Sequence, residues 1–105
     1  MNRSFIEVRK ALPGDAPVIA GFQISMAMET EQILLDVNVV SLGVQAVFHD
    51  VSKGQYFVAL EDGKIIGSML TTPEWSDWRN RIVLWIQSVY ILPEYRRKGV
   101  FRKLY

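Results

Sequence analysis

The sequence predicts an α/β fold of the α+β type, in which a mixed, mostly antiparallel sheet is flanked by helices. Three consecutive segments with strand character, 55–60, 65–72 and 81–92, are joined by short connections, which indicates an antiparallel meander. Segments with helical periodicity lie before and after them. The 105 residues, half of them apolar, suffice for one small domain or for a piece of one.

The N-terminal part of the chain is expected to form a strand and then a helix. Residues 5–9 are predicted to be the strand, and turn-forming residues around Pro13 follow it. Asp15 is suited to cap the next helix, with Pro17 in the first turn, where a missing amide donor costs nothing. Apolar residues at steps of three and four predict that this helix extends to about residue 30.

A second helix and a hairpin are expected in the middle of the chain. Valines at helical spacing predict the helix over 37–48. After residue 54 the pattern changes to that of strands. Asp62 and Gly63 lie between the strands 55–60 and 65–72, and they supply the positive φ angles that a tight hairpin turn requires.

The last third of the chain is expected to contain a loop, a long strand and the start of a helix. Residues 74–80 mix polar and aromatic side chains and are predicted to form the loop. The strand 81–92 follows, and Pro93 ends it because proline cannot donate a ladder hydrogen bond. The helix is expected to begin around Arg97.

The composition excludes several kinds of site and protein. The chain contains no cysteine, which rules out disulfides, thiolate metal sites and cysteine nucleophiles. Its single histidine, His49, rules out a multi-histidine metal centre. No apolar run has the length of a membrane-spanning helix, and the N-terminus lacks the apolar region of a secretory signal. We therefore expect a metal-free, soluble, cytoplasmic domain with no membrane partner.

The charge of the chain is distributed unevenly. Residues 1–93 carry a net charge of −3, whereas residues 94–105 carry +4. This basic segment follows a strand, contains Gly99 and leads into the predicted helix, whose first amides would be unpaired. Glycine has no Cβ, so an anion can approach the backbone there. The arrangement predicts a ligand that bears phosphate.

The same segment, 89–105, resembles the acetyl-coenzyme A signature of the GNAT superfamily of N-acetyltransferases. In that signature a strand and a proline precede Arg/Gln-x-x-Gly-x-Gly/Ala, and a helix follows. Arg96 matches the first position and Gly99 the fourth, whereas Phe101 stands where glycine or alanine is usual. The predicted order of strands and helices upstream is also similar to that of the family.

The resemblance implies acetyl-CoA as cosubstrate and transfer of its acetyl group to a primary amine of a small molecule or peptide. The backbone at Val89, Tyr90 and Ile91 would bind the pantetheine arm. The pyrophosphate would be held by the segment that begins at Arg96 and continues through Arg97, Lys98, Gly99, Val100, Phe101 and Arg102.

Catalysis of this kind needs an oxyanion donor and a base. A strand amide near Val89 is a candidate for the donor. The candidates for the base are Glu29, Glu31 and a water held by Gln87 or Ser88, although both glutamates also fit a solvated helix end. Because the family's domain continues beyond the pyrophosphate-binding helix, residues 1–105 are expected to be a partial acetyltransferase domain that is inactive alone.

Two other functions compete with this interpretation. The basic segment is also compatible with a nucleic-acid-binding module, although a sequence pI near 8.0 is low for that class. A non-catalytic assembly function is the other alternative, because the strand 81–92 would leave one sheet edge unpaired. The exposed edge predicts a homodimer. Trp75, Trp78 and Trp85 fit either an amine pocket or structural anchors.

Overall fold

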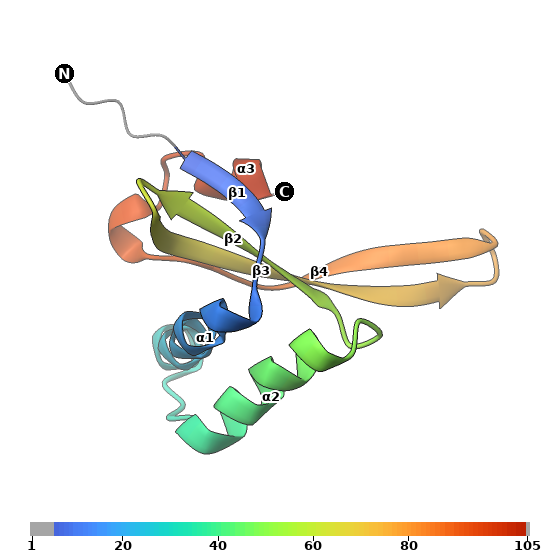
Figure 1. Ribbon diagram of the computed structural model, residues 1–105, viewed down its shortest axis with the longest axis horizontal. Helices are drawn as coiled ribbons and strands as arrows, with labels where there is room; N and C mark the ends of the chain where they lie inside the picture. Colours follow the sequence, from blue (N-terminus) through green and yellow to red (C-terminus); the bar gives the residue numbers. More distant parts are fainter. Residues whose placement is uncertain (1–5, 105) are drawn as a thin grey trace.

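The computed structural model describes residues 6–104 and contains a four-stranded sheet with helices on both faces (Figure 1). The strand order is β1-β2-β3-β4, and every pairing is antiparallel. The predicted α+β class is confirmed. The elements in chain order are β1 (Ile6–Lys10), the 3₁₀ turn η1 (Pro13–Asp15), α1 (Ala16–Glu31), α2 (Val37–His49), β2 (Gln55–Glu61), β3 (Lys64–Ser76), β4 (Arg81–Ile91), a second 3₁₀ turn η2 (Pro93–Tyr95) and α3 (Val100–Leu104).

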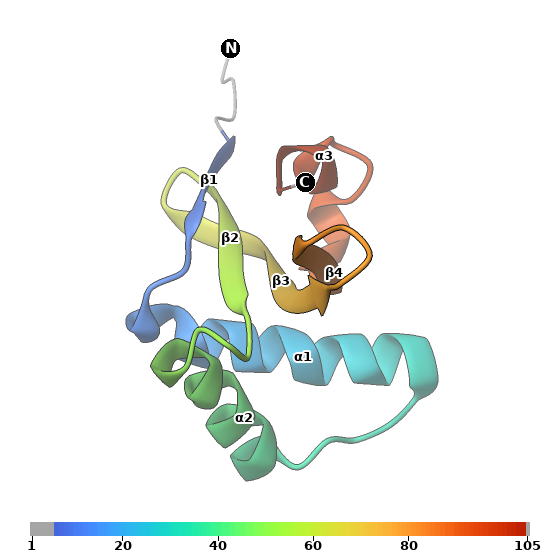
Figure 2. The same ribbon diagram turned by 90° about the vertical axis from the view of Figure 1, so that its right-hand side faces the viewer.

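The helices form two layers around the sheet. Figure 2 shows α1 and α2 on one face and α3 on the other. Each layer has its own apolar cluster, because side chains of a strand alternate between the two faces. On the α1 side the buried residues are Ala11, Ala16, Ile19, Ala20, Val44, Tyr56, Val58 and Leu60. On the α3 side they are Ala59, Ile66, Met69, Val100 and Leu104.

The boundaries of the N-terminal elements agree with the prediction, but the cap of α1 does not. Phe5, the first residue of the predicted strand, lies outside the described residues. Asp15 makes no side-chain cap on α1. Its carboxylate instead accepts hydrogen bonds from the Arg9 guanidinium and from the amide of Leu12, both at 2.8 Å. The carboxylate therefore joins β1 to η1. Because Arg9 and the Leu12 amide occupy it, it does not cap α1.

The predicted loop at 74–80 is wrong in its first half. Residues 74–76 continue β3 and pair with the start of β4, and only 77–80 form the turn. The strand pairing explains the difference, since each polar residue of this stretch faces a partner on β4. Together β3 and β4 form a hairpin arm that extends well beyond the helices (Figure 1).

One face of this arm is apolar and uncovered by the residues that the structure describes. Trp75 lies opposite Ile82, and Pro73 lies opposite Leu84, so these side chains share a face. Trp75, Ile82 and Leu84 are each at least 60% exposed. Because isolated hairpins gain stability from a covered apolar face, this arm is suited to further packing.

A β-bulge interrupts β4 before its C-terminal end. Tyr90 lies opposite Ser68, but past this pair the register shifts by one residue, so that Ser88 and Val89 together face Met69. Ser88 has a φ of 50°, in the left-handed region. Bulges bend a strand and release backbone groups from the ladder.

No helix in the described part of the chain is long and apolar enough to cross a membrane.

Candidate functional site

The chain leaves β4 through a loop whose backbone is left-handed at two positions. η2 ends at Tyr95, Arg96 is extended, and φ is 65° at Arg97 and 81° at Gly99. The predicted helix start near Arg97 is therefore wrong: α3 begins at Val100. Two left-handed residues cannot continue a right-handed helix, so the turn is longer than the sequence indicated.

Several amides of this turn have no acceptor within residues 6–104. The backbone hydrogen bonds on either side are donated by Arg96 to the Pro93 carbonyl and by Lys103 to the Gly99 carbonyl. Between them, none is recorded for the amides of Arg97, Lys98, Gly99, Val100 and Arg102. We call residues 96–102 the anion loop, since unpaired amides together with basic side chains favour a negatively charged ligand.

A pocket of about 380 Å³ opens beside the anion loop. Its lining joins the end of β4 to the loop and the first turn of α3. The lining residues are Ile91, Tyr95, Arg96, Arg97, Gly99, Val100, Phe101 and Arg102. Lys98 does not line it but lies with its ammonium 5.6 Å from the centre of the Tyr95 ring. Most of the residues predicted to bind the cofactor therefore line this pocket.

A second pocket, of about 280 Å³, lies between α1 and the end of β4. It adjoins the first pocket, because Ile91 and Arg96 line both. The complete lining of this second pocket is Met26, Glu29, Thr30, Val89, Tyr90, Ile91 and Arg96. Together the two pockets border the C-terminal half of β4 from its bulge to the anion loop.

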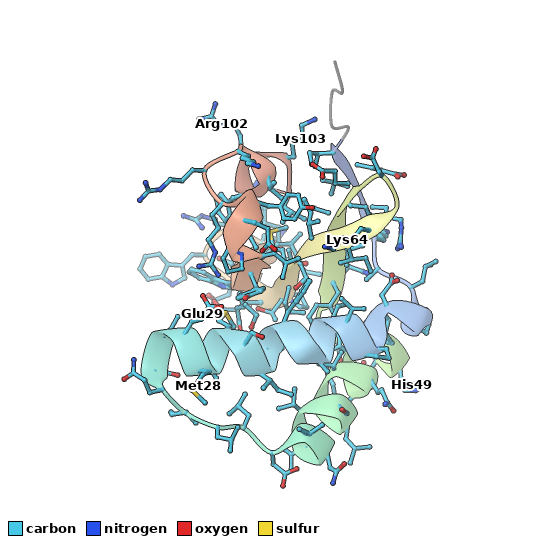
Figure 3. The ribbon with its side chains drawn as sticks, turned by 90° about the vertical axis from the view of Figure 1, so that its left-hand side faces the viewer. Met28, Glu29, His49, Lys64, Arg102 and Lys103 are labelled. Atoms are coloured by element: carbon cyan, nitrogen blue, oxygen red, sulfur yellow. The ribbon has the colours of Figure 1, made fainter. Side chains whose placement is uncertain are left out.

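Glu29 is the centre of a polar cluster that connects three elements. Its carboxylate accepts a hydrogen bond from the Tyr90 hydroxyl at 2.6 Å and one from Nη2 of Arg96 at 2.8 Å. Arg96 also donates from Nε to the carbonyl of Ile91 at 2.8 Å, and its guanidinium lies 5.3 Å from the centre of the Tyr90 ring. Figure 3 shows Glu29 on the side of α1 that faces the sheet.

These contacts shift the protonation equilibria of the cluster. The hydrogen bond from Tyr90, followed by that from Arg96, lowers the pKa of Glu29 below its ordinary value. Burial, with the Glu29 carboxylate second, raises the pKa of Tyr90. Glu29 is thus held as a carboxylate whose two oxygens are both engaged.

The other candidates for the base lie outside both pockets. Glu31 is exposed at the end of α1. The Gln87 side chain donates from Nε2 to the Thr72 hydroxyl at 2.8 Å. The three tryptophans lie on the arm or in its turn and line neither pocket. Among residues 6–104, no group of three potential metal ligands occurs.

The link between Glu29 and Arg96 was missed by the sequence analysis. Phe22, Met26 and Glu29 follow one another at helical spacing, so a carboxylate lies on a face of α1 that is otherwise apolar. That pattern was the available signal. Phe22 packs against Tyr90 with ring centroids 5.2 Å apart, which aligns this face with the end of β4.

Comparisons with known proteins identify the family and the fold of the chain. A model of the acetyltransferase (GNAT) family matches residues 26–105. The chain belongs to the GNAT family of acetyltransferases. No curated protein matches it.

Solved structures of acetyltransferases resemble the chain over nearly its whole length. A possible acetyltransferase from Clostridium difficile is 47% identical, with a TM-score of 0.89, and the match covers 94% of this chain. The chain spans 65% of the length of that protein. A ribosomal-protein-alanine N-acetyltransferase from Brucella melitensis is 15% identical with a TM-score of 0.76, over 95% of this chain and 66% of that one.

An aminoglycoside N-acetyltransferase in complex with CoA also has a TM-score of 0.76 at 15% identity, over 98% of this chain and 66% of that one. At this level of identity, the similarity to the last two structures concerns the fold.

Proposed function

We propose that the chain binds acetyl-CoA and forms the cosubstrate-binding part of an N-acetyltransferase that acts on primary amines. The anion loop carries the proposal, since it combines amides without an acceptor, left-handed backbone at Arg97 and Gly99, and an adjoining pocket. The exposed Arg97 and Arg102 guanidinium groups supply positive charge beside those amides. Family membership supports the same ligand.

The residues of the anion loop fit a pyrophosphate group. The backbone amides of Arg97, Lys98, Gly99, Val100 and Arg102 would bind its oxygens, and the side chains of Arg97, Lys98 and Arg102 would balance its charge. A Cβ added to Gly99 meets no protein atom within 4 Å, so this side of the loop is open to a ligand. Phe101, in place of a small residue, is 47% exposed and does not close the pocket.

The end of β4 fits the pantetheine arm. Val89 belongs to the bulge, Tyr90 and Ile91 follow it, and all three line the second pocket. In the proposal their backbone groups bind the arm as an added strand would. Acetyl-CoA supplies a thioester whose carbonyl carbon a neutral amine would attack; the C–N bond forms, the C–S bond breaks, and coenzyme A leaves as a thiolate that takes up the proton lost by the amine. An amide of the bulge near Val89 would stabilise negative charge on the thioester oxygen.

The acceptor in this proposal is a primary amine of a small molecule or a peptide. Two of the similar structures, an aminoglycoside N-acetyltransferase and a ribosomal-protein-alanine N-acetyltransferase, represent these two classes of acceptor. Since both oxygens of Glu29 are engaged, the remaining candidates for the base are Glu31 and a water held by Gln87 or Ser88, although none of these three residues lines either pocket. We also propose a cytoplasmic location, because acetyl-CoA is an intracellular cosubstrate.

Calorimetric titration with CoA tests the proposal directly. We expect saturable binding by the unaltered chain and a rise of its melting temperature with CoA concentration. The variant Gly99→Val should bind much more weakly, because a branched side chain is strained at φ 81° and projects toward the ligand. Pantetheine, which lacks the pyrophosphate, is the matched ligand control. No binding of CoA at millimolar concentration would refute the proposal.

A homodimer is a second proposal, supported by the hairpin arm. From Ile82 to Ile91 β4 carries no charged residue, and its outer edge has no partner among the described strands. Natural edge strands are usually protected by charge, so two such edges from two copies can pair without repulsion. The variant Leu84→Lys should then be monomeric in sedimentation experiments in which the unaltered chain is dimeric. Monomers of both would refute this proposal.

Nucleic-acid binding is less favoured as an alternative. Glu29 pairs with Arg96, which removes one cation from the basic segment. Steeply salt-dependent binding of an oligonucleotide would support the alternative against acetyl transfer.

A further inference from the structure

We propose that Glu29 is a positioning residue for the anion loop, acting through the side chain of Arg96. The inference rests on the proposed function, because the loop is assigned to the pyrophosphate of CoA. Glu29 lines the second pocket, but it would not accept the amine proton. Its carboxylate would fix Arg96, and Arg96 would fix the direction in which the chain leaves β4.

The guanidinium of Arg96 is already committed to the protein. Nη2 donates to Glu29 and Nε donates to the carbonyl of Ile91, each at 2.8 Å. Its flat face lies over the Tyr90 ring, whose hydroxyl donates to the other oxygen of Glu29. The planar, five-donor head of arginine suits such a multiple contact. Two of the five donors of Arg96 are thus held by the protein, and its side chain connects α1 to the loop.

Arg96 directly precedes Arg97, where the backbone of the loop is strained. Arg97 is left-handed although it carries a side chain, a conformation that must be held by its surroundings. At the far end of the loop, the buried side chains of Val100 and Leu104 fix α3 against the sheet. With both ends held, the amides between them are arranged before the ligand arrives, and binding then costs less ordering entropy.

If Glu29 acted only through its charge, its loss would strengthen the binding of CoA, whereas loss of a positioning residue would weaken it. Removal of a carboxylate near the anion loop makes the potential there more positive, which favours an anionic ligand. Loss of positioning disfavours the same ligand. The sign of the change in CoA affinity therefore separates the two roles. Glu94 offers a matched control, because it is an exposed carboxylate two residues before Arg96.

Calorimetric titration with CoA of the unaltered chain, Glu29→Gln and Glu94→Gln tests the inference. We expect Glu29→Gln to weaken binding about tenfold, as loss of preorganisation does, and Glu94→Gln to leave it equal or slightly tighter. In a double-mutant cycle, Glu29→Gln should have no further effect in the Arg96→Gln background, since it acts only through Arg96. Melting temperatures without ligand show whether each variant folds.

If Glu29→Gln does not fold, Arg96→Lys replaces it in the test. Lysine keeps the charge but cannot make both hydrogen bonds and cover Tyr90, so CoA affinity should again fall. Unchanged or tighter binding by the folded variants would overturn the positioning role and leave the proposed function intact. Failure of the unaltered chain to bind CoA would overturn both.

Discussion

The Arg9 guanidinium donates two hydrogen bonds to the carboxylate of Asp15, at 2.8 and 3.4 Å. The pair joins β1 to the turn that precedes α1, and the amide of Leu12 adds a third bond to the same carboxylate. The Arg9 hydrogen bond, against an opposing effect of burial, lowers the pKa of Asp15 below its ordinary value of 3.8. Folding and ionisation of Asp15 are therefore linked.

The variant Asp15→Asn should lower the free energy of unfolding at pH 7 by about 1 kcal/mol, the size of a charge-assisted hydrogen bond that is partly exposed. Because the folded pKa is depressed, the stabilisation is present above pH 3.8 and is lost as the pH falls through the folded pKa. Denaturant unfolding from pH 7 to 2 measures the difference from the unaltered chain, which should shrink in acid. A constant difference would contradict the linkage.

Asp50 allows a direct titration experiment. Its carboxylate accepts hydrogen bonds from the hydroxyl and amide of Ser52, at 2.6 and 3.0 Å, and from Lys53 at 3.2 Å. These contacts, the Ser52 hydroxyl first, lower the pKa of Asp50 to about 2. The variant Ser52→Ala removes that hydroxyl and should move the pKa toward 3.8. Side-chain carboxyl chemical shifts followed by NMR report it, and an unchanged midpoint would refute the assignment.

Gly54 precedes β2 at a position where no side chain fits. Its φ is 146°, and an added Cβ would lie 2.7 Å from the carbonyl oxygen of Thr71. The variant Gly54→Ala should therefore lower the free energy of unfolding by more than about 1 kcal/mol. Gly14→Ala is the control, because no atom lies within 4 Å of its added Cβ. Equal melting temperatures of the two variants would contradict this prediction.

Ser88 at the bulge of β4 tests whether the strand needs its left-handed residue. A β-branched side chain is strongly disfavoured at a φ of 50°. We expect Ser88→Val to lower stability by about 1–2 kcal/mol and Ser88→Gly to preserve or raise it. Urea unfolding of both variants measures this. If the valine variant were as stable as the unaltered chain, the bulge would not require that conformation.

The regular elements of the fold were predictable because their signals are local. The helices over 16–31 and 37–49 follow from apolar spacing, and the hairpin turn follows from Asp62 and Gly63. The extension of β3 through Ser76 was not predictable, since its polar residues are stabilised by their partners on β4. Strand pairing overrides the local preference of such a segment.

Only the part of the candidate site that lies in one continuous segment of the chain was predictable from the sequence. The order strand, proline and basic glycine turn indicated where a phosphate would bind. The partnership of Glu29 with Arg96 joins residues that lie far apart in the sequence. No spacing rule within one helix or one turn reports a contact between the end of α1 and a loop after β4.

The attachment of β1 to the sheet bears on how the molecule assembles. Among the described strands β1 pairs only with β2, from which it is separated by the whole of α1 and α2, whereas β2, β3 and β4 follow one another through short turns. Closing the longer connection costs more chain entropy than closing a hairpin. The meander would thus assemble early and β1 would dock late, as the strand that completes the sheet.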